Sequence, residues 1–167
     1  MDDLPPVALL VRLWLGFAIG IVAVVSVAVV AAEAQPDLPV ALPAALAAAA
    51  SIAAIVGVAA VDRTFAASPP DDDRDALTEF RTRAFLQVGI AEAPVLFAFA
   101  LTFVLGPPWV AAIGGVGGIA SLAVARPTPG RINRIEAAWR AAGHDVSVLR
   151  AAREQAPDPG ADDQEHL

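Results

Sequence analysis

Residues 81–105 read Arg81-Thr-Arg-Ala-Phe-Leu-Gln-Val-Gly-Ile-Ala-Glu92-Ala-Pro94-Val-Leu-Phe-Ala-Phe-Ala-Leu-Thr-Phe-Val-Leu105, and this stretch decides the fold. It is long enough to cross a bilayer as a helix, which takes about 20 apolar residues. Glu92 lies well inside the apolar part, where an ionised and unpaired carboxylate costs roughly 2.5–3.5 kcal/mol on insertion scales. An acid at that depth in a membrane helix is a candidate functional site.

The composition of the whole chain is typical of a membrane protein. Its 167 residues are 57% hydrophobic and only 17% charged, whereas roughly 25% charged is usual for a soluble domain. The net charge of −7 comes mostly from acids outside the apolar runs, so it indicates solvated segments rather than an acidic binding surface. There is no cysteine, and His144 and His166 both lie in the C-terminal tail. The sequence therefore predicts no metal site and no cofactor.

Four apolar runs predict an all-α fold: an integral membrane four-helix bundle, followed by an amphipathic cytoplasmic helix. The membrane domain covers residues 1–126, with spans at about 7–31, 39–61, 84–105 and 109–125. The first span could also be a cleaved signal sequence, because Ala32-Glu33-Ala34 has the small residues of a cleavage site. Its long apolar run and acidic leader favour a retained span.

Small residues indicate where the spans pack. Gly16 and Gly20 share one face of the first span, and Gly114 and Gly118 share one face of the fourth, so each pair permits close helix approach. The second span is made almost entirely of small residues, and we therefore expect it in the middle of the bundle. Trp109, at the start of the fourth span, is predicted to lie at the membrane interface.

A cluster of acids, Asp71 to Asp73, precedes the third span. Carboxylates could bind Ca²⁺ or Mg²⁺ there. The alternative is a helix N-cap followed by acids in the first turn. The N-cap is favoured, because neither the glycine turn nor the closing glutamate of an EF-hand follows.

Residues 127–155 are predicted to form an amphipathic helical segment on the cytoplasmic face of the membrane. Ile132, Ile135 and Trp139 recur at helical spacing beside several arginines, which suits a helix lying on anionic headgroups. Nucleic-acid binding is the alternative for such a basic helix, but the nearby acids and the membrane spans disfavour it. Residues 156–167 are rich in Pro, Gly and acid and are predicted to be disordered.

The arginines predict the orientation of the chain. All 11 basic residues are Arg, and four spans put every one of them on the side that holds both termini and the loop 62–80. The opposite side, formed by residues 33–38 and 106–108, has none. The positive-inside rule therefore places both termini in the cytoplasm. The richness in Ala, Arg and Pro indicates a GC-rich genome, and we expect a bacterial inner membrane.

Glu92 has neighbours in sequence that suit a polar pocket. It lies about two helical turns from Ala84, near the middle of the membrane. Gly89 removes bulk one turn away, and Pro94 lacks an N–H group and favours a kink. Ser51, near the centre of the second span, is the predicted hydrogen-bonding partner. No cationic side chain is predicted at that depth, so no salt bridge to Glu92 is expected within the chain.

The stretch from Ala84 to Phe97, with Glu92 and Pro94 inside it, resembles the second helix of subunit c, the ring-forming proteolipid of rotary ATP synthases. In that family the matching acid binds the translocated proton or sodium ion, so the resemblance implies such a role for Glu92. The chain departs from the family in its long Pro- and Asp-rich loop and in its first and fourth spans. It also resembles small uncharacterised four-span bacterial membrane proteins with an Ala-Glu-Ala-Pro-like motif in the third helix.

Three hypotheses for function follow. Glu92 is a polar structural clamp between the second and third spans, or it is a proton- or cation-binding site with Ser51 as co-ligand. In the third hypothesis the protein is a membrane scaffold: the glycine faces mediate homo-oligomerisation or contact with a membrane-protein partner, and the tail recruits a cytoplasmic partner. We expect no enzymatic activity, because there is no Ser/His/Asp set, no His–Glu metal motif and no second acid at the depth of Glu92.

Overall fold

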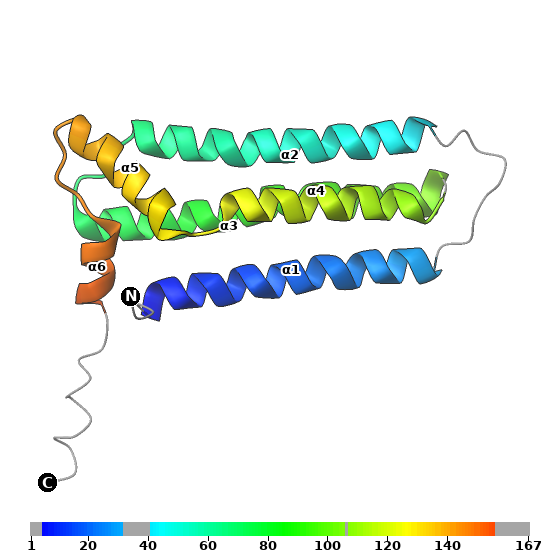
Figure 1. Cartoon of the computed structure of the whole chain (residues 1–167), viewed down its shortest axis with the longest axis horizontal. Helices are drawn as coiled ribbons and strands as arrows, with labels where there is room; N and C mark the ends of the chain where they lie inside the picture. The colour runs from blue at the N-terminus through cyan, green and yellow to red at the C-terminus, as the bar shows by residue number, and fades with distance from the viewer. Residues whose placement is uncertain (1–4, 32–40, 106, 156–167) are drawn as a thin grey trace, which may run out of the picture.

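The computed structural model describes residues 5–31, 41–105 and 107–155. Within them the protein is all-α (Figure 1), with helices α1 (Pro5–Ala31), α2 (Ala41–Ala67), α3 (Asp73–Leu105), α4 (Trp109–Ala125), α5 (Pro129–Ala141) and α6 (Val148–Glu154). The predicted disordered tail and the first residues of the predicted second span lie outside the described residues.

The chain is a multi-pass membrane protein by the length and hydropathy of its helices. Helices α1, α2 and α3 are each long and apolar enough to cross a bilayer. Helix α4 has 17 residues and meets the same test only together with α5, from which it is bent by 56°. All four apolar helices pack together, as Figure 1 shows, so the structure has three to four membrane spans.

Two helices extend beyond their predicted spans at one end of the bundle. We call this the arginine end, because the arginines of the chain lie on the helix turns and loops there. Helix α2 continues to Ala67, and α3 begins at Asp73, well before its apolar part. Asp72 caps α3, since its carboxylate accepts a hydrogen bond from the backbone N–H of Asp75 at 2.8 Å. The N-cap interpretation of the acid cluster is therefore confirmed.

Helix α4, rather than α2, lies in the middle of the bundle. Figure 1 shows α1 and α2 on opposite sides of the α3–α4 pair, and within the described residues α1 and α2 make no contact. A Cβ atom added to Gly114 would collide with the backbone of Pro94 in α3, and one added to Gly117 would collide with Ser51 in α2. A Cβ atom added to Gly115 would likewise collide with the side chain of Val25 in α1. The expectation for α2 was wrong: although α2 is made of small residues, the glycines that approach three neighbouring helices are those of α4.

The two predicted glycine faces have different surroundings. Gly118 lies, like Gly114, against α3, where an added Cβ would meet Val95 at 2.5 Å. Gly16 and Gly20 of α1 have no atom within 4 Å of the Cβ position and are exposed. Close approach within the chain therefore uses the glycines of α4 and leaves those of α1 on the outer surface.

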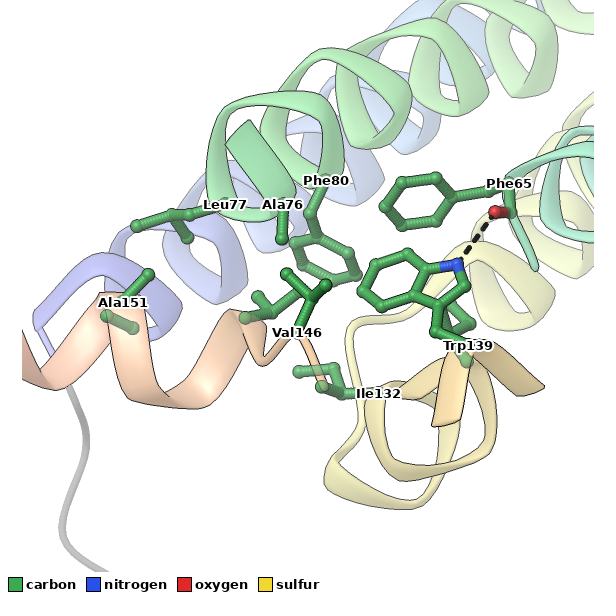
Figure 2. Packing of buried hydrophobic residues seen from close by; sticks show 11 residues of the cluster. Phe65, Ala76, Leu77, Phe80, Ile132, Trp139, Val146 and Ala151 are labelled. Carbon is green, nitrogen blue, oxygen red and sulfur yellow. Dashed lines mark hydrogen bonds between the residues drawn. The ribbon is translucent and has the colours of Figure 1, made fainter. Parts of the chain in front are cut away.

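A second core lies beyond the membrane bundle at the arginine end. Residues 73–83 of α3, together with α5 and α6, form a unit that we call the cap. Its core includes Trp139, which is fully buried and donates from Nε1 to the Phe65 carbonyl at 3.1 Å (Figure 2). The Trp139 and Phe65 rings meet edge to face, with centroids 4.9 Å apart. Such a buried aromatic pair contributes roughly 0.5–1.5 kcal/mol beyond its burial.

The cap replaces the surface helix expected from the sequence. Ile132, Ile135 and Trp139 were predicted to contact the membrane surface, but the structure buries them to 5% exposure or less. Their partners are Phe65 at the end of α2 and the residues at the start of α3. The reason is that both helices extend beyond their predicted spans and offer protein surface to the apolar face of α5. Helical spacing shows that such a face exists, but not whether lipid or protein covers it.

Candidate functional site

Glu92 lies on the side of α3 that faces α1, not α2. Val88 and Val95 of α3 pack with residues of α1, and Glu92 is four residues from one and three from the other, so it shares their face. Ile90, by contrast, approaches Gly57 of α2. Two residues of an α-helix that are two positions apart point in nearly opposite directions. The prediction that Glu92 faces the second span is therefore wrong.

Ser51 has a structural partner of its own. Its hydroxyl donates to the Ala47 carbonyl one turn earlier in α2, at 2.8 Å. Ser51 is buried where α2 meets Gly117 of α4. Within the described residues Ser51 makes no hydrogen bond to Glu92. The two residues that the sequence joined into one site thus belong to different helix interfaces.

The predicted supporting residues are also separated. Gly89 is exposed and has open space at its Cβ position, so it lies on the outer surface of α3. Pro94 is buried inside α3 and packs against Gly114, and the helix continues through it to Leu105. Glu92 itself is partly buried. The described residues contain no group of three or more side chains able to hold a metal ion.

Trp109 lies at the opposite end of the bundle from the cap. It begins α4 and is 45% exposed. An exposed indole at the first turn of a membrane helix suits a position among lipid headgroups. Its contact with the membrane interface stays a prediction, since no membrane is part of the structure.

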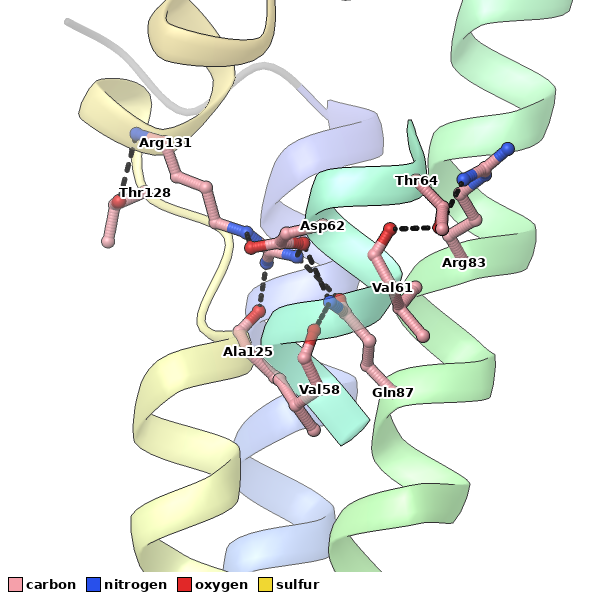
Figure 3. A network of polar contacts seen from close by, with 9 residues as sticks. All are labelled: Val58, Val61, Asp62, Thr64, Arg83, Gln87, Ala125, Thr128 and Arg131. Atoms are coloured by element: carbon pink, nitrogen blue, oxygen red, sulfur yellow. Dashed lines mark hydrogen bonds and ion pairs between the residues drawn. The ribbon is translucent and has the colours of Figure 1, made fainter. Parts of the chain in front are cut away.

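The structure instead builds a polar site at the arginine end, around Arg131 of α5 (Figure 3). Its guanidinium donates through Nε to Asp62 Oδ2 at 2.8 Å, and through Nη2 to Asp62 Oδ1 as well. The same Nη2 donates to Gln87 Oε1 at 2.5 Å, and Nη1 donates to the Ala125 carbonyl. Arg131 therefore joins the ends of α2 and α4 and the middle of α3 to the first turn of α5. We call these contacts the arginine clamp.

Gln87 completes the clamp from within the membrane part of α3. Its side chain is fully buried, and its Nε2 donates to Asp62 Oδ1 at 2.7 Å and to the Val58 carbonyl at 3.0 Å. Both the donor and the acceptor of the amide are thus used. Only 11% of the Arg131 side chain and 28% of the Asp62 side chain are exposed. A buried ion pair needs such additional hydrogen bonds, because taking both charges out of water is costly.

Local sequence explains how Arg131 reaches this position. Helix α4 ends at Ala125, and Pro127 and Pro129 keep the chain from continuing as one helix. Thr128 caps α5 with its hydroxyl, which accepts from the Arg131 N–H at 3.3 Å. The last carbonyls of a helix lack partners within it and carry negative partial charge. The Arg131 cation satisfies one of them at Ala125.

A further buried carboxylate holds the cap together. Glu136 of α5 is 6% exposed and accepts hydrogen bonds from the Ser147 hydroxyl at 3.0 Å and from the Leu149 N–H at 3.3 Å. Asp73 of α3 accepts from the Ser147 N–H at 2.8 Å and pairs with Arg150 of α6 at 2.6 Å. These contacts join α3, α5 and α6 at the start of α6.

Sequence reasoning missed both polar sites. Asp62 and Arg131 are 69 residues apart, and no local pattern joins them. The available signal was polarity inside apolar runs: Gln87 lies within the predicted third span, and Asp62 directly follows the second. The uncharged amide of Gln87 is a weaker signal in an apolar run than the carboxyl of Glu92.

Comparison of the chain with known protein families, with curated proteins and with solved structures finds no match. The resemblance to subunit c rests on the residues quoted for it. The structure adds one apolar helix before the resembling hairpin in the chain, α1, and one after it, α4. The chain is a helical, multi-pass membrane protein of three to four spans for which no family is shown.

Proposed function

We propose that the chain is a non-enzymatic membrane scaffold that holds a folded cap at one face of the bilayer. The observation that carries this proposal is the arginine clamp, which ties the cap to three membrane helices at once. A flexible tail would need no buried ion pair to set its position. A partner that binds the cap would therefore meet a surface held in a fixed place relative to the membrane.

The proposal places the cap in the cytoplasm of a bacterium. The distribution of the 11 arginines supports this orientation, because positive charge is enriched on the cytoplasmic side of membrane proteins. The chain has no native cysteine, so a single introduced cysteine can be labelled without background. His144→Cys, in the exposed turn of the cap, is expected to resist an impermeant maleimide in intact cells and to react after lysis. Labelling in intact cells would reverse the orientation.

A photo-crosslinking amino acid at His144 tests the scaffold function itself. We expect a discrete, saturable adduct with a partner in native membranes. The adduct should weaken in Arg131→Met, which loosens α5 from the membrane helices, and should be retained in Arg140→Met, which changes an exposed arginine of the same helix. If no discrete adduct forms at His144 or at other exposed cap positions, the cap has no partner and the proposal fails.

A polar clamp between helices is part of the proposal, but it is placed at Arg131, Asp62 and Gln87. Glu92 supports a second candidate function, proton or cation binding. The specific observation is a partly buried carboxyl in the apolar part of α3 for which the described residues supply no hydrogen bond. A hydrophobic carbodiimide should label the protein in a pH-dependent way, and Glu92→Gln should abolish the labelling. Equal labelling of the variant would remove Glu92 as the reactive site.

A further inference from the structure

A cavity of about 580 Å³ opens at the arginine end, between the last turns of α2, the end of α4 and α5. Four arginines line it, Arg63, Arg126, Arg131 and Arg134, against the single carboxylate of Asp62. The whole chain carries a net charge of −7, so the positive charge here is a local feature. We call this space the arginine cavity.

The carboxylate in the wall of the arginine cavity does not neutralise the other arginines. Both oxygens of Asp62 are engaged by Arg131 within the clamp. Within the described residues, Arg63, Arg126 and Arg134 form no ion pair with a carboxylate. All three are exposed. Arg63 and Arg134 therefore line one space without a protein anion of their own, which favours a bound anion.

Arg126 differs from Arg63 and Arg134, because its guanidinium is directed towards α1. The guanidinium of Arg126 lies over the Trp14 ring of α1, 5.6 Å from its centroid. Trp14 is itself fixed, because its Nε1 donates to the Leu122 carbonyl of α4 at 2.6 Å. The stacking holds the Arg126 guanidinium on the side of α4 that packs against α1. The forked N–H groups of Arg63 and Arg134 are the ones available to match the oxygens of a phosphate group.

The wall of the arginine cavity on the membrane side is apolar. Ala59 of α2 and Ala123 and Val124 of α4 line it below the arginines. Val124 is 44% exposed on the last turn of α4, where the bundle surface meets lipid. The space thus has a cationic part towards the cap and an apolar part that continues onto the lipid-facing surface. A ligand with a phosphate and an attached acyl chain matches both parts.

We infer that the arginine cavity binds the phosphate group of an anionic phospholipid from the surrounding leaflet. Arg63 and Arg134 donate to the phosphate oxygens, and an acyl chain lies along Ala123 and Val124. Arg131 forms the wall and stays engaged with Asp62. This inference goes beyond the scaffold function and does not depend on whether the cap has a protein partner.

The test uses the full chain in nanodiscs of phosphatidylcholine with increasing fractions of phosphatidylglycerol, and native mass spectrometry counts retained lipid. The test variant is Arg63→Gln with Arg134→Gln, since neither side chain forms a contact that the fold needs. The control is Arg140→Gln with Arg153→Gln, which removes equal charge from exposed sites outside the cavity. We expect retention of phosphatidylglycerol to weaken on the order of 30-fold in the test variant, from two basic contacts at a membrane surface, and little in the control.

Two further measurements distinguish the phosphate of a lipid from that of a free phosphate compound. Inorganic phosphate and glycerol phosphate should not displace the retained phosphatidylglycerol, because they lack the acyl chain. Displacement by either at equal concentration would assign the cavity to a free phosphate compound and overturn the lipid inference. Equal retention by the wild type and the test variant, or an equal loss in the control, would overturn the site altogether. Circular dichroism of each variant confirms that the fold is intact.

Discussion

Replacing Arg131 by Met tests how strongly the cap is held to the membrane bundle. The substitution removes the guanidinium and keeps an apolar stem of similar length. Asp62 then keeps only the Gln87 amide as a side-chain donor, and the buried Gln87 Oε1 loses its donor. Breaking a buried ion pair costs about 3–5 kcal/mol. Because 28% of the Asp62 side chain is exposed and water can take part, we expect the lower end, about 3 kcal/mol.

Hydrogen exchange of the full-length protein in micelles measures this cost directly. A loss of about 3 kcal/mol raises the open population of the cap roughly hundredfold, so α5 amides should exchange about a hundred times faster. Amides in the centre of α1, which do not contact the clamp, should keep their rates. Arg140→Met, an exposed position on the same helix, should change nothing. The reasoning is refuted if exchange in α5 rises by less than about threefold.

A double variant measures the interaction between Arg131 and Asp62 separately from their other contacts. Asp62→Asn removes the carboxylate that Arg131→Met leaves unpaired. The double variant should therefore be less destabilised than the sum of the two single variants, with an interaction of about 0.5–3 kcal/mol. Strict additivity would show that Arg131 acts through some contact other than Asp62.

Three further predictions concern packing and the cap, each measured as the change in free energy of unfolding in denaturing micelles. Gly114→Ala should destabilise by about 1–3 kcal/mol because its Cβ meets the backbone of α3, whereas Gly16→Ala should be neutral or slightly stabilising; equal effects would contradict the central place of α4. Trp139→Phe should cost about 1 kcal/mol for the lost hydrogen bond, and Trp139→Ala about 3–5 kcal/mol; a lipid-facing indole would give far smaller values. Glu136→Ala should cost about 1–3 kcal/mol because the start of α6 loses its acceptor, and Ser147→Ala should cost less.

The spans could be predicted because each leaves a local signal. Apolar length identified α1, α2 and the membrane part of α3, and the acids from Asp71 to Asp73 identified the start of α3. Counting the Arg residues between the apolar runs was enough to predict that they lie at one end of the bundle. These properties depend on the composition of one segment or of a few neighbouring residues.

Helix pairing could not be predicted, because it depends on segments far apart in the chain. The prediction that Glu92 faces α2 rested on its expected depth in the membrane. Depth does not determine which side of a helix a residue occupies. The apolar face of α5 was predicted to contact lipid. The extension of α3 that covers this face is polar in sequence, so it did not indicate a protein surface. Arg131 and Asp62 meet only once α4 and α5 are folded, so neither residue marks the clamp by itself.

The glycine faces of α4 have a consequence for how the protein assembles during its synthesis. The ribosome produces α1, α2 and α3 before α4, yet within the described residues α1 and α2 do not touch. Helix α4 contacts all three earlier helices. The first hairpin therefore enters the membrane without an interface of its own, and its two helices are joined only through α3 and α4, each of which contacts both of them. A chain that ends before Trp109 therefore lacks the one helix whose glycines approach all three of the others, and the surfaces of α1, α2 and α3 that α4 covers stay open.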